Sequence, residues 1–515
     1  AAHAYRAFPH VRPAETYDAK ATGKNLEQAE EENPFFNAWV RRIDIKELLK
    51  TGKDCGPFPP SSLFDGAILD DIVKEVLDSA GSLTRHDEKT ITLRKSWLEE
   101  PTRFILTVGN LRGTPYWQHI QGVADVGYGM NTGRDYQTFA LMPPASTVTW
   151  FNDEIPLMAG AVGSNLDTWK ALGQWGLASG AFPVGLPPRE LVHGKQDLRY
   201  RVVTESDDPG AGRYAAAIPS IDWPAQKPRQ DTDDAEGTSR VYDFIAVDGG
   251  TLNNEPLNLA REVLAGGAGR NPREGNKATR AVVLIDPFPK FAPPAAPEEG
   301  DMALWKVVPT MMDMWKGTAR FNVEDLVLSN LEEVYSRFQI APSRDSPSPK
   351  AKSLACGVLG RFGGFLNEAY RRHDYYLGRR NAQRMLRQYL VLPEDNKLFE
   401  HNKKTDPALD TAKFTAHYPN ESKKYYSIIP IVPDTPIDMP EPEPDWPQAG
   451  LVREYGLSLL FADRLSEVAK CSLKTSGLSG FRVFFLSLLV SQVVKSKVGP
   501  MVQKYLKDAL DEWGL

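Results

Sequence analysis

Two short apolar runs separated by a helical segment constrain the fold of this chain more than any other feature. Residues 242–247 (YDFIAV) and 281–285 (AVVLI) have the composition of strands that are buried on both faces of a mainly parallel sheet. A helical segment over 255–264 lies between them. Because strand, helix and strand in this order form a right-handed crossover, the sequence predicts an α/β fold with a mainly parallel sheet.

Periodicity and capping residues predict further elements around this unit. Ser61 to Asp65 offers an N-cap for a helix over 67–77. A strand is predicted at 103–108, bounded by Gly109 and Asn110. The remaining predicted segments are helices over 34–49, 166–177, 363–390 and 451–469, and a short strand with a loop within 136–151.

Proline-rich stretches suggest where the chain divides. Residues 286–298 and 430–447 contain too many prolines for a helix or a central strand, so they are predicted to be loops or straps. The resulting organisation is an N-terminal arm (1–33), an α/β core (34–300), a helical extension (301–429), a Pro-rich strap (430–447) and C-terminal helices (448–515).

Composition excludes several classes of function. The net charge of −6 gives no basic footprint for nucleic acid. Cys55, Cys356 and Cys471 lie far apart, which argues against a disulfide framework or a zinc site and indicates a reducing, cytoplasmic location. No carboxylate cluster has metal-ligand spacing, and no cofactor is expected.

The most apolar stretch of the chain is 481–494 (FRVFFLSLLVSQVV). It is shorter than the ~20 residues that a transmembrane helix needs. We expect a helix that is buried against the core, with peripheral contact to lipid as the alternative. Residues 1–32 are polar and charged, so no signal peptide is expected.

The motif that most resembles a chemical site is Asp248-Gly249-Gly250, directly after the strand over 242–247. Open α/β sheets bind ligands beyond the carboxyl ends of their strands, and paired glycines let the backbone turn sharply beside a carboxylate. Asn253 and Pro256 then suit the start of the next helix. Asp248 is therefore either a turn residue or a catalytic group, and spacing alone does not separate the two.

Five segments of the chain, in this order, resemble the patatin-like phospholipases of the large bacterial type. They are Asn110–Tyr116 (NLRGTPY), Ala178–Pro183 (ASGAFP), Asp248–Pro256 (DGGTLNNEP), Asp286–Pro289 (DPFP), and a C-terminal region with Tyr335–Phe338 (YSRF) and Phe362–Asn381. In that family the Asp of the DGG motif is the general base of a Ser–Asp dyad.

The resemblance implies a three-layer patatin-like core and a lipid acyl hydrolase that is a serine esterase or phospholipase. Asp248 would be the catalytic base, and Gly249 and Gly250 would shape the site. The implied substrate is a lipid or another acyl ester, with peripheral membrane contact. No cofactor, metal or nucleic acid is implied.

Two parts of the family's catalytic machinery do not occur in this sequence. No serine lies in a GxSxG nucleophile elbow; Ser164, Ser179 and Ser479 each lack at least one of the two glycines. A Gly-rich oxyanion loop is also missing before Pro34. We therefore expect the nucleophile on a segment outside these residues or on a second polypeptide. The alternatives are an inactive module that binds lipid or protein, and Ser179 as an unconventional nucleophile.

Other polar residues are interpreted as structural. His193 shows no HExxH or paired spacing. His373-Asp374, beside Arg371-Arg372, is predicted to form a salt-bridged cluster on a helix and not a catalytic dyad. Arg379 and Arg380 are predicted to pair with nearby Asp or Glu residues, with a lipid phosphate as the alternative. Arg112, at a strand end, is not expected to be catalytic.

Overall fold

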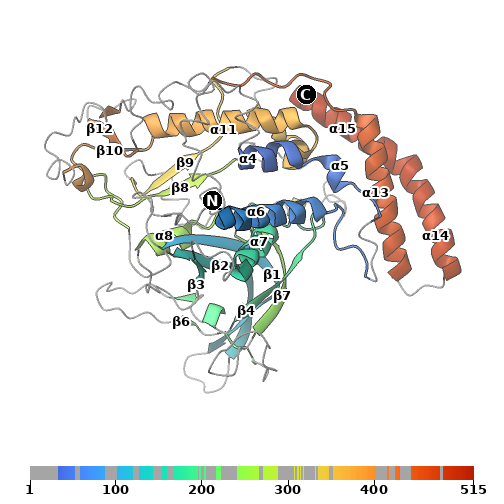
Figure 1. Cartoon of the computed structure of the whole chain (residues 1–515), viewed down its shortest axis with the longest axis horizontal. Helices are drawn as coiled ribbons and strands as arrows, with labels where there is room; N and C mark the ends of the chain where they lie inside the picture. The colour runs from blue at the N-terminus through green and yellow to red at the C-terminus, as the bar shows by residue number, and fades with distance from the viewer. Residues whose placement is uncertain are drawn as a thin grey trace.

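A five-stranded sheet and a set of long helices make up most of the regular structure of the chain. The computed structural model describes residues 33–52, 58–86, 101–119, 127–142, 154–158, 166–194, 196–198, 202–203, 216–217, 219–221, 241–253, 255–265, 271–287, 307, 310–311, 314, 317, 331, 334–346, 352–400, 415–416, 424–429, 442–475 and 480–515. Figure 1 shows the sheet with α6 and α7 in the lower part, α11 across the top, and α13, α14 and α15 at the right.

The five-stranded sheet has the strand order β3-β2-β1-β7-β4. Its strands are β1 (Thr102–His119), β2 (Gly127–Met142), β3 (Glu154–Met158), β4 (Arg189–Gly194) and β7 (Val241–Asp248). All neighbouring pairs are antiparallel except β2 with β3. The long β1–β2 hairpin changes register between Gly109 and Thr114.

The class of the fold is therefore mixed α/β, but the prediction of a mainly parallel sheet is wrong. Strand β7 pairs with β1 and β4, whereas β8 (Val282–Ile285) pairs in parallel with β9 (Arg337–Ile340) in a separate two-stranded sheet. Within the run over 242–247, Asp243 and Ile245 are exposed, Ile245 by 43%, while Phe244 and Ala246 are buried. This alternation is typical of an antiparallel sheet with one buried face.

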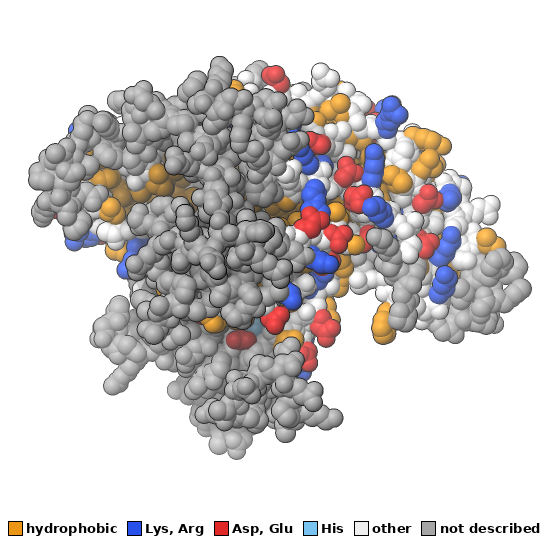
Figure 2. Space-filling view, viewed as in Figure 1, with side chains coloured by type: hydrophobic (Ala, Val, Ile, Leu, Met, Phe, Trp, Pro, Cys, Tyr) orange, Lys and Arg blue, Asp and Glu red, His pale blue; other side chains and the backbone are white. Residues whose placement is uncertain are grey.

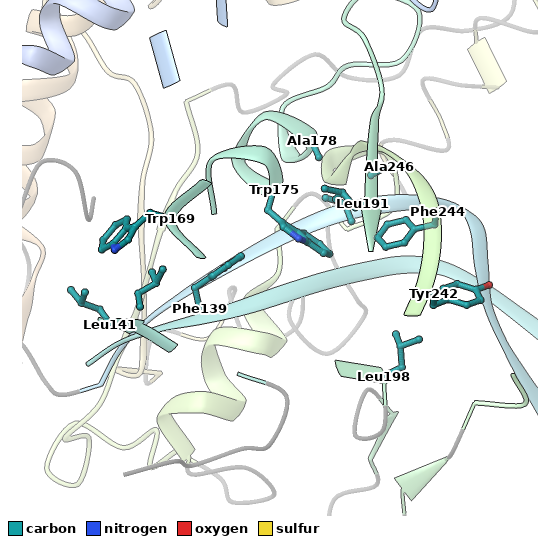
Figure 3. Packing of buried hydrophobic residues seen from close by; sticks show 12 residues of the cluster. Phe139, Leu141, Trp169, Trp175, Ala178, Leu191, Leu198, Tyr242, Phe244 and Ala246 are labelled. Carbon is teal, nitrogen blue, oxygen red and sulfur yellow. The ribbon is translucent and has the colours of Figure 1, made fainter. Parts of the chain in front are cut away.

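Helix α7 (Leu166–Ser179) packs on the buried face of the sheet. Its Trp169 and Trp175 belong to one hydrophobic cluster with Phe139, Leu191 and Phe244 (Figure 3). Helix α6 (Ala67–His86) lies against α7 (Figure 1), and a Cβ at Gly173 would stand 2.7 Å from a methyl group of Val73.

A second hydrophobic cluster joins both ends of the described chain. It contains Leu48 and Leu49 near the start, Tyr370 of α11 (Glu368–Gln388), and Leu506 and Leu510 of α15 (Gly499–Trp513). Helix α13 (Glu454–Thr475) contributes the fully buried Arg464, which donates hydrogen bonds to the backbone oxygens of Leu63 and Lys50.

The remaining elements are short, apart from α8 and α14. They are α4 (Pro34–Phe36), η1 (Asn37–Arg42), α5 (Ile45–Leu48), η2 (Gln196–Leu198), β5 (Val202–Val203), β6 (Ala216–Ala217), η4 (Gly249–Thr251), α8 (Leu257–Ala265), η6 (Ala355–Gly357), η7 (Leu359–Phe365), β10 (Val391–Pro393), β11 (Thr415–Ala416), β12 (Tyr425–Ser427), α14 (Gly480–Val493) and η9 (Val494–Val498).

Most helices that were expected from periodicity are present, and their bounds differ locally. Asp65 caps α6 as predicted, by accepting a hydrogen bond from the Ala67 backbone N–H at 2.9 Å. The single helix predicted over 34–49 is instead divided into α4, η1 and α5. The division falls before Asp44, whose extended backbone and side-chain cap start α5. Residues 1–32, Ser164, Ser479 and Asn254 lie outside the described residues.

Two expectations about the C-terminal region are wrong. Helix α14 is not buried, because Leu488 and Leu489 are more than half exposed. Cys471 forms a disulfide bond, whereas Cys356 is a free thiol, so the expectation that all cysteines stay reduced does not hold. Among the described residues, none of the helices combines the length and the apolar character that crossing a membrane requires.

Candidate functional site

Asp248 occupies the last position of β7 and begins a tight turn into η4. Its backbone N–H donates to the Ala181 oxygen at 2.8 Å, and its backbone oxygen accepts from the Thr251 hydroxyl at 2.7 Å. Its carboxylate Oδ1 accepts a hydrogen bond from the Gly250 N–H at 2.7 Å. The side chain is partly exposed, so the carboxylate is held at the rim of the sheet rather than inside it.

The first glycine of the motif is required by close packing against β1. A Cβ at Gly249 would stand 2.3 Å from the backbone oxygen of Thr107 and 2.5 Å from its hydroxyl. Gly109, two residues farther along β1, also lies against the turn, because a Cβ there would lie 2.9 Å from the Thr251 hydroxyl. Any larger residue at position 249 would push the turn, and Asp248 with it, away from β1.

Three of the five segments that resemble patatin-like proteins meet at this turn. The segment over 178–183 ends α7 and provides the Ala181 oxygen for Asp248. The segment over 110–116 is part of β1, where Asn110 pairs with Ala246 two residues before Asp248. Residues 286 and 287, by contrast, follow β8 in the other sheet, so the fourth segment does not join the five-stranded sheet.

The β1 bulge beside the turn is fixed by its own polar contacts. The Asn110 side-chain oxygen accepts from the N–H groups of Arg112 and Gly113, at 3.0 and 2.8 Å. The guanidinium of Arg112 stacks over the Tyr242 ring, with its Cζ 3.9 Å from the ring centroid. It also donates a hydrogen bond to the backbone oxygen of Asp243 at 2.8 Å. Arg112 therefore has the structural position expected for it.

Sequence reasoning missed a buried polar cluster in the same sheet. His193 of β4 is fully buried, and its Nε2 lies 3.0 Å from both carboxylate oxygens of Asp135 on β2. Asp135 also accepts from the Asn110 amide at 2.8 Å, and the His193 Nδ1 lies 3.7 Å from the Asp197 carboxylate. Since 58 residues separate His193 from Asp135, no local spacing could reveal the pair.

The surroundings of His193 indicate a positioning role and not a catalytic one. Its ring stacks on Phe244 at 5.0 Å between centroids and contacts Trp175 at 5.2 Å. No surface of the imidazole reaches solvent, so a substrate cannot contact it. Through Asn110 the cluster nevertheless supports the strand that pairs with the residues before Asp248. The pKa of the Tyr242 hydroxyl is raised above its ordinary value, mainly by burial. The positive charge of Arg112 lowers this pKa, and the negative charge of Asp135 raises it.

The salt-bridged cluster that was predicted around His373 is confirmed. The His373 Nδ1 lies 2.6 Å from the Asp374 carboxylate, whose two oxygens accept from the N–H groups of Ala355 and Cys356, both at 2.9 Å. Burial, reinforced by Asp374, raises the pKa of the Cys356 thiol well above its ordinary value. A thiol held in its neutral form is a poor nucleophile, so Cys356 is not a catalytic candidate.

Arg380 pairs with carboxylates, as the sequence predicted. Its guanidinium contacts Asp345 and lies 3.4 Å from Glu443, while Arg384 lies 2.8 Å from Asp345. Glu443 also accepts from the Asp345 N–H at 2.7 Å. Through Glu443, these contacts attach residues 442–447, the described part of the Pro-rich strap, to α11.

Among the serines considered as nucleophiles, Ser179 is in the described part of the chain. Ser179 is the last residue of α7, two positions before the Ala181 oxygen that binds the Asp248 N–H. No group of three metal-binding side chains occurs within the described parts of the chain.

Comparison with known proteins gives a relative but no function. The uncharacterized protein y4iI of Sinorhizobium fredii (strain NBRC 101917 / NGR234) is 28% identical over 438 residues, which cover 79% of this chain and 59% of the relative. No protein-family model matches the chain, and no solved structure matches it. The chain thus spans less than two thirds of the relative's length.

Proposed function

We propose that this chain carries the general base of a lipid acyl hydrolase of patatin type, with Asp248 as that base. The observation that supports the proposal most is the way the Asp248 turn is fixed. Ala181, Thr251 and the close approach of Gly249 to β1 hold one carboxylate at the end of a strand, partly open to solvent. A carboxylate has acceptor positions for several hydrogen bonds, so its bond to the Gly250 N–H is compatible with a role as a base.

In the proposed reaction, Asp248 accepts the proton of a serine hydroxyl as the serine oxygen attacks the ester carbonyl carbon. The tetrahedral intermediate then expels the alcohol, which takes the proton from Asp248. Water, deprotonated by the same carboxylate, then attacks the carbonyl carbon of the acyl-serine. The bond to the serine oxygen breaks, the carboxylic acid leaves, and Asp248 returns the proton to the serine oxygen. Asp248 needs no imidazole for these steps, which agrees with the inaccessible position of His193.

We place the nucleophilic serine outside these 515 residues, on a further segment or a second polypeptide that also completes a three-layer core. The β8–β9 sheet supports this placement. Parallel strands are normally covered on both faces, yet Val283 is 43% and Ile285 is 73% exposed. A segment that docks here would cover them.

The second candidate function is a patatin-like module that binds lipid or protein without catalysis. One observation favours it: the contact of the Asp248 carboxylate with Gly250 is also what an ordinary capping aspartate makes. The two candidates differ in whether any serine becomes reactive toward acylating reagents.

A fluorophosphonate probe separates the two candidates. The native protein from cells that produce it is labelled, and the labelled peptide is identified by mass spectrometry. We expect label on a serine outside residues 1–515, and a labelling rate reduced about 10²- to 10⁴-fold in Asp248→Asn. Asp243→Asn, an exposed change on the same strand, is the matched control and should label normally.

Two results would contradict a hydrolase with Asp248 as its base, and a third would change the position of its nucleophile. Equal labelling of Asp248→Asn and the native protein would remove Asp248 from the mechanism, and no labelling of any protein would favour the binding module. Loss of labelling in Ser179→Ala, with the label on Ser179 itself, would move the nucleophile into this chain.

A further inference from the structure

Helix α14 presents apolar side chains to solvent along most of its described length. Leu486, Leu488, Leu489 and Val493 are 38, 52, 56 and 53% exposed. The helix packs on α13 through its other side and lies on the outer side of α13, away from the body of the molecule (Figure 1). Soluble domains rarely expose several adjacent large apolar residues without a binding function.

The segment around α14 is also the most consistently basic part of an acidic chain. Residues 468–507 contain no Asp or Glu, although the whole chain has 67 of them and a net charge of −6. The basic residues of this segment are Lys470, Lys474, Arg482, Lys495, Lys497, Lys504 and Lys507. Hydrophobic and basic side chains lie near one another over the α13–α15 region in Figure 2, with acidic side chains among them.

The start of α15 extends the same combination. Met501 and Tyr505 are each 64% exposed, and Lys504 lies between them in an exposed position. Because Met501 and Tyr505 are four residues apart, they share one face of the helix. Exposed apolar side chains bordered by lysines are the pattern of helices that lie in a membrane interface.

We infer that α14, η9 and the first turns of α15 form a docking surface for anionic lipid bilayers. Since no described helix is long and apolar enough to cross a membrane, the surface would lie along the bilayer, with leucines among the acyl chains and lysines at the head groups. A second copy of the chain is a poorer occupant. Pairing this face with itself would bring two acid-free basic segments together.

The inference concerns binding and does not depend on Asp248. Sedimentation with vesicles measures it without any catalytic step, and the fluorophosphonate probe measures the proposed hydrolase without vesicles. Failure of one therefore leaves the other intact.

The test compares binding of the full chain to two kinds of vesicle: phosphatidylcholine alone, and phosphatidylcholine with about 30% phosphatidylserine. The second composition gives a surface potential typical of an anionic leaflet. We expect binding to the anionic vesicles that weakens as salt rises. Leu486→Ser, Leu489→Ser and Val493→Ser together should lower the affinity by at least about tenfold. Lys497→Gln with Lys504→Gln should lower it by about tenfold while leaving the apolar face unchanged.

The matched control places serine at exposed apolar positions far from this surface. Tyr128 and Met130 on β2 are 53 and 51% exposed, and the double serine variant should bind vesicles like the native chain. The inference is overturned if the native chain does not bind anionic vesicles, or if neither the leucine nor the lysine variant weakens binding. It is also overturned if sedimentation equilibrium shows a dimer that the leucine variant dissociates, because the face would then join two copies.

Discussion

Replacing Gly249 with alanine tests whether close packing against β1 positions Asp248. The added Cβ would lie 2.3 Å from the Thr107 backbone oxygen, about 1 Å closer than ordinary van der Waals contact. Thr107 cannot easily move, because β1 is paired with β2 on one side and β7 on the other. Overpacking of this kind costs about 1–3 kcal/mol of folding free energy, and the turn is the part that can shift.

A shift of about 1 Å in a catalytic group lowers the rate by roughly 10²-fold. We therefore expect Gly249→Ala to lower the urea midpoint and to slow fluorophosphonate labelling of the native protein by about that factor. Gly176→Ala is the matched control. A Cβ at Gly176 meets no atom within 4 Å, so alanine in this exposed part of α7 should stabilise the helix by about 0.5–1 kcal/mol and leave labelling unchanged. A Gly249→Ala protein with native stability and native labelling would refute the reasoning.

Two further predictions concern stability. His193→Ala should lower the free energy of unfolding by about 3–5 kcal/mol in urea titrations, because it leaves the Asp135 carboxylate buried beside a cavity. His193→Gln keeps a hydrogen-bond donor and should lower the free energy of unfolding by less. A loss below about 1 kcal/mol for the alanine variant would contradict the pairing of His193 with Asp135. Burial opposes ionisation of Glu443, but backbone hydrogen bonds and Arg344 lower its pKa below the usual 4.5. A lowered pKa in the folded state stabilises the strap above pH 4.5, and this stability is lost as the pH falls through the folded pKa. The amides of Asp345 and Ser346 donate to the Glu443 carboxylate, so their protection factors in hydrogen exchange, corrected for the intrinsic exchange rate, should fall in acid. Glu443→Gln should lower these protection factors at neutral pH, and protection factors of the native protein that do not change with pH would contradict the prediction.

Local sequence determined several helices and strands, and it determined the position of Asp248 in the candidate site. The helix over 166–177, the Asp65 cap of α6 and the strand over 242–247 depend on periodicity and on contacts between neighbours in the chain, and all three are present. The position of Asp248 at the end of its strand follows from the same local signals. The pairing of His373 with Asp374 was also predicted from neighbouring residues of one helix, whereas Asp345 and Glu443, which pair with Arg380, lie outside that helix and reach it only through the fold.

Tertiary structure alone decided which strands are neighbours and which surfaces stay open. An apolar strand such as 242–247 can pair in either direction, and only the distant partners β1 and β4 fix it as antiparallel. His193 and Asp135 meet across two strands that are far apart in sequence, and the apolar helix α14 is exposed because only one of its sides meets α13. Periodicity records which face of an element is apolar, but what covers that face depends on contacts between residues that are distant in the chain.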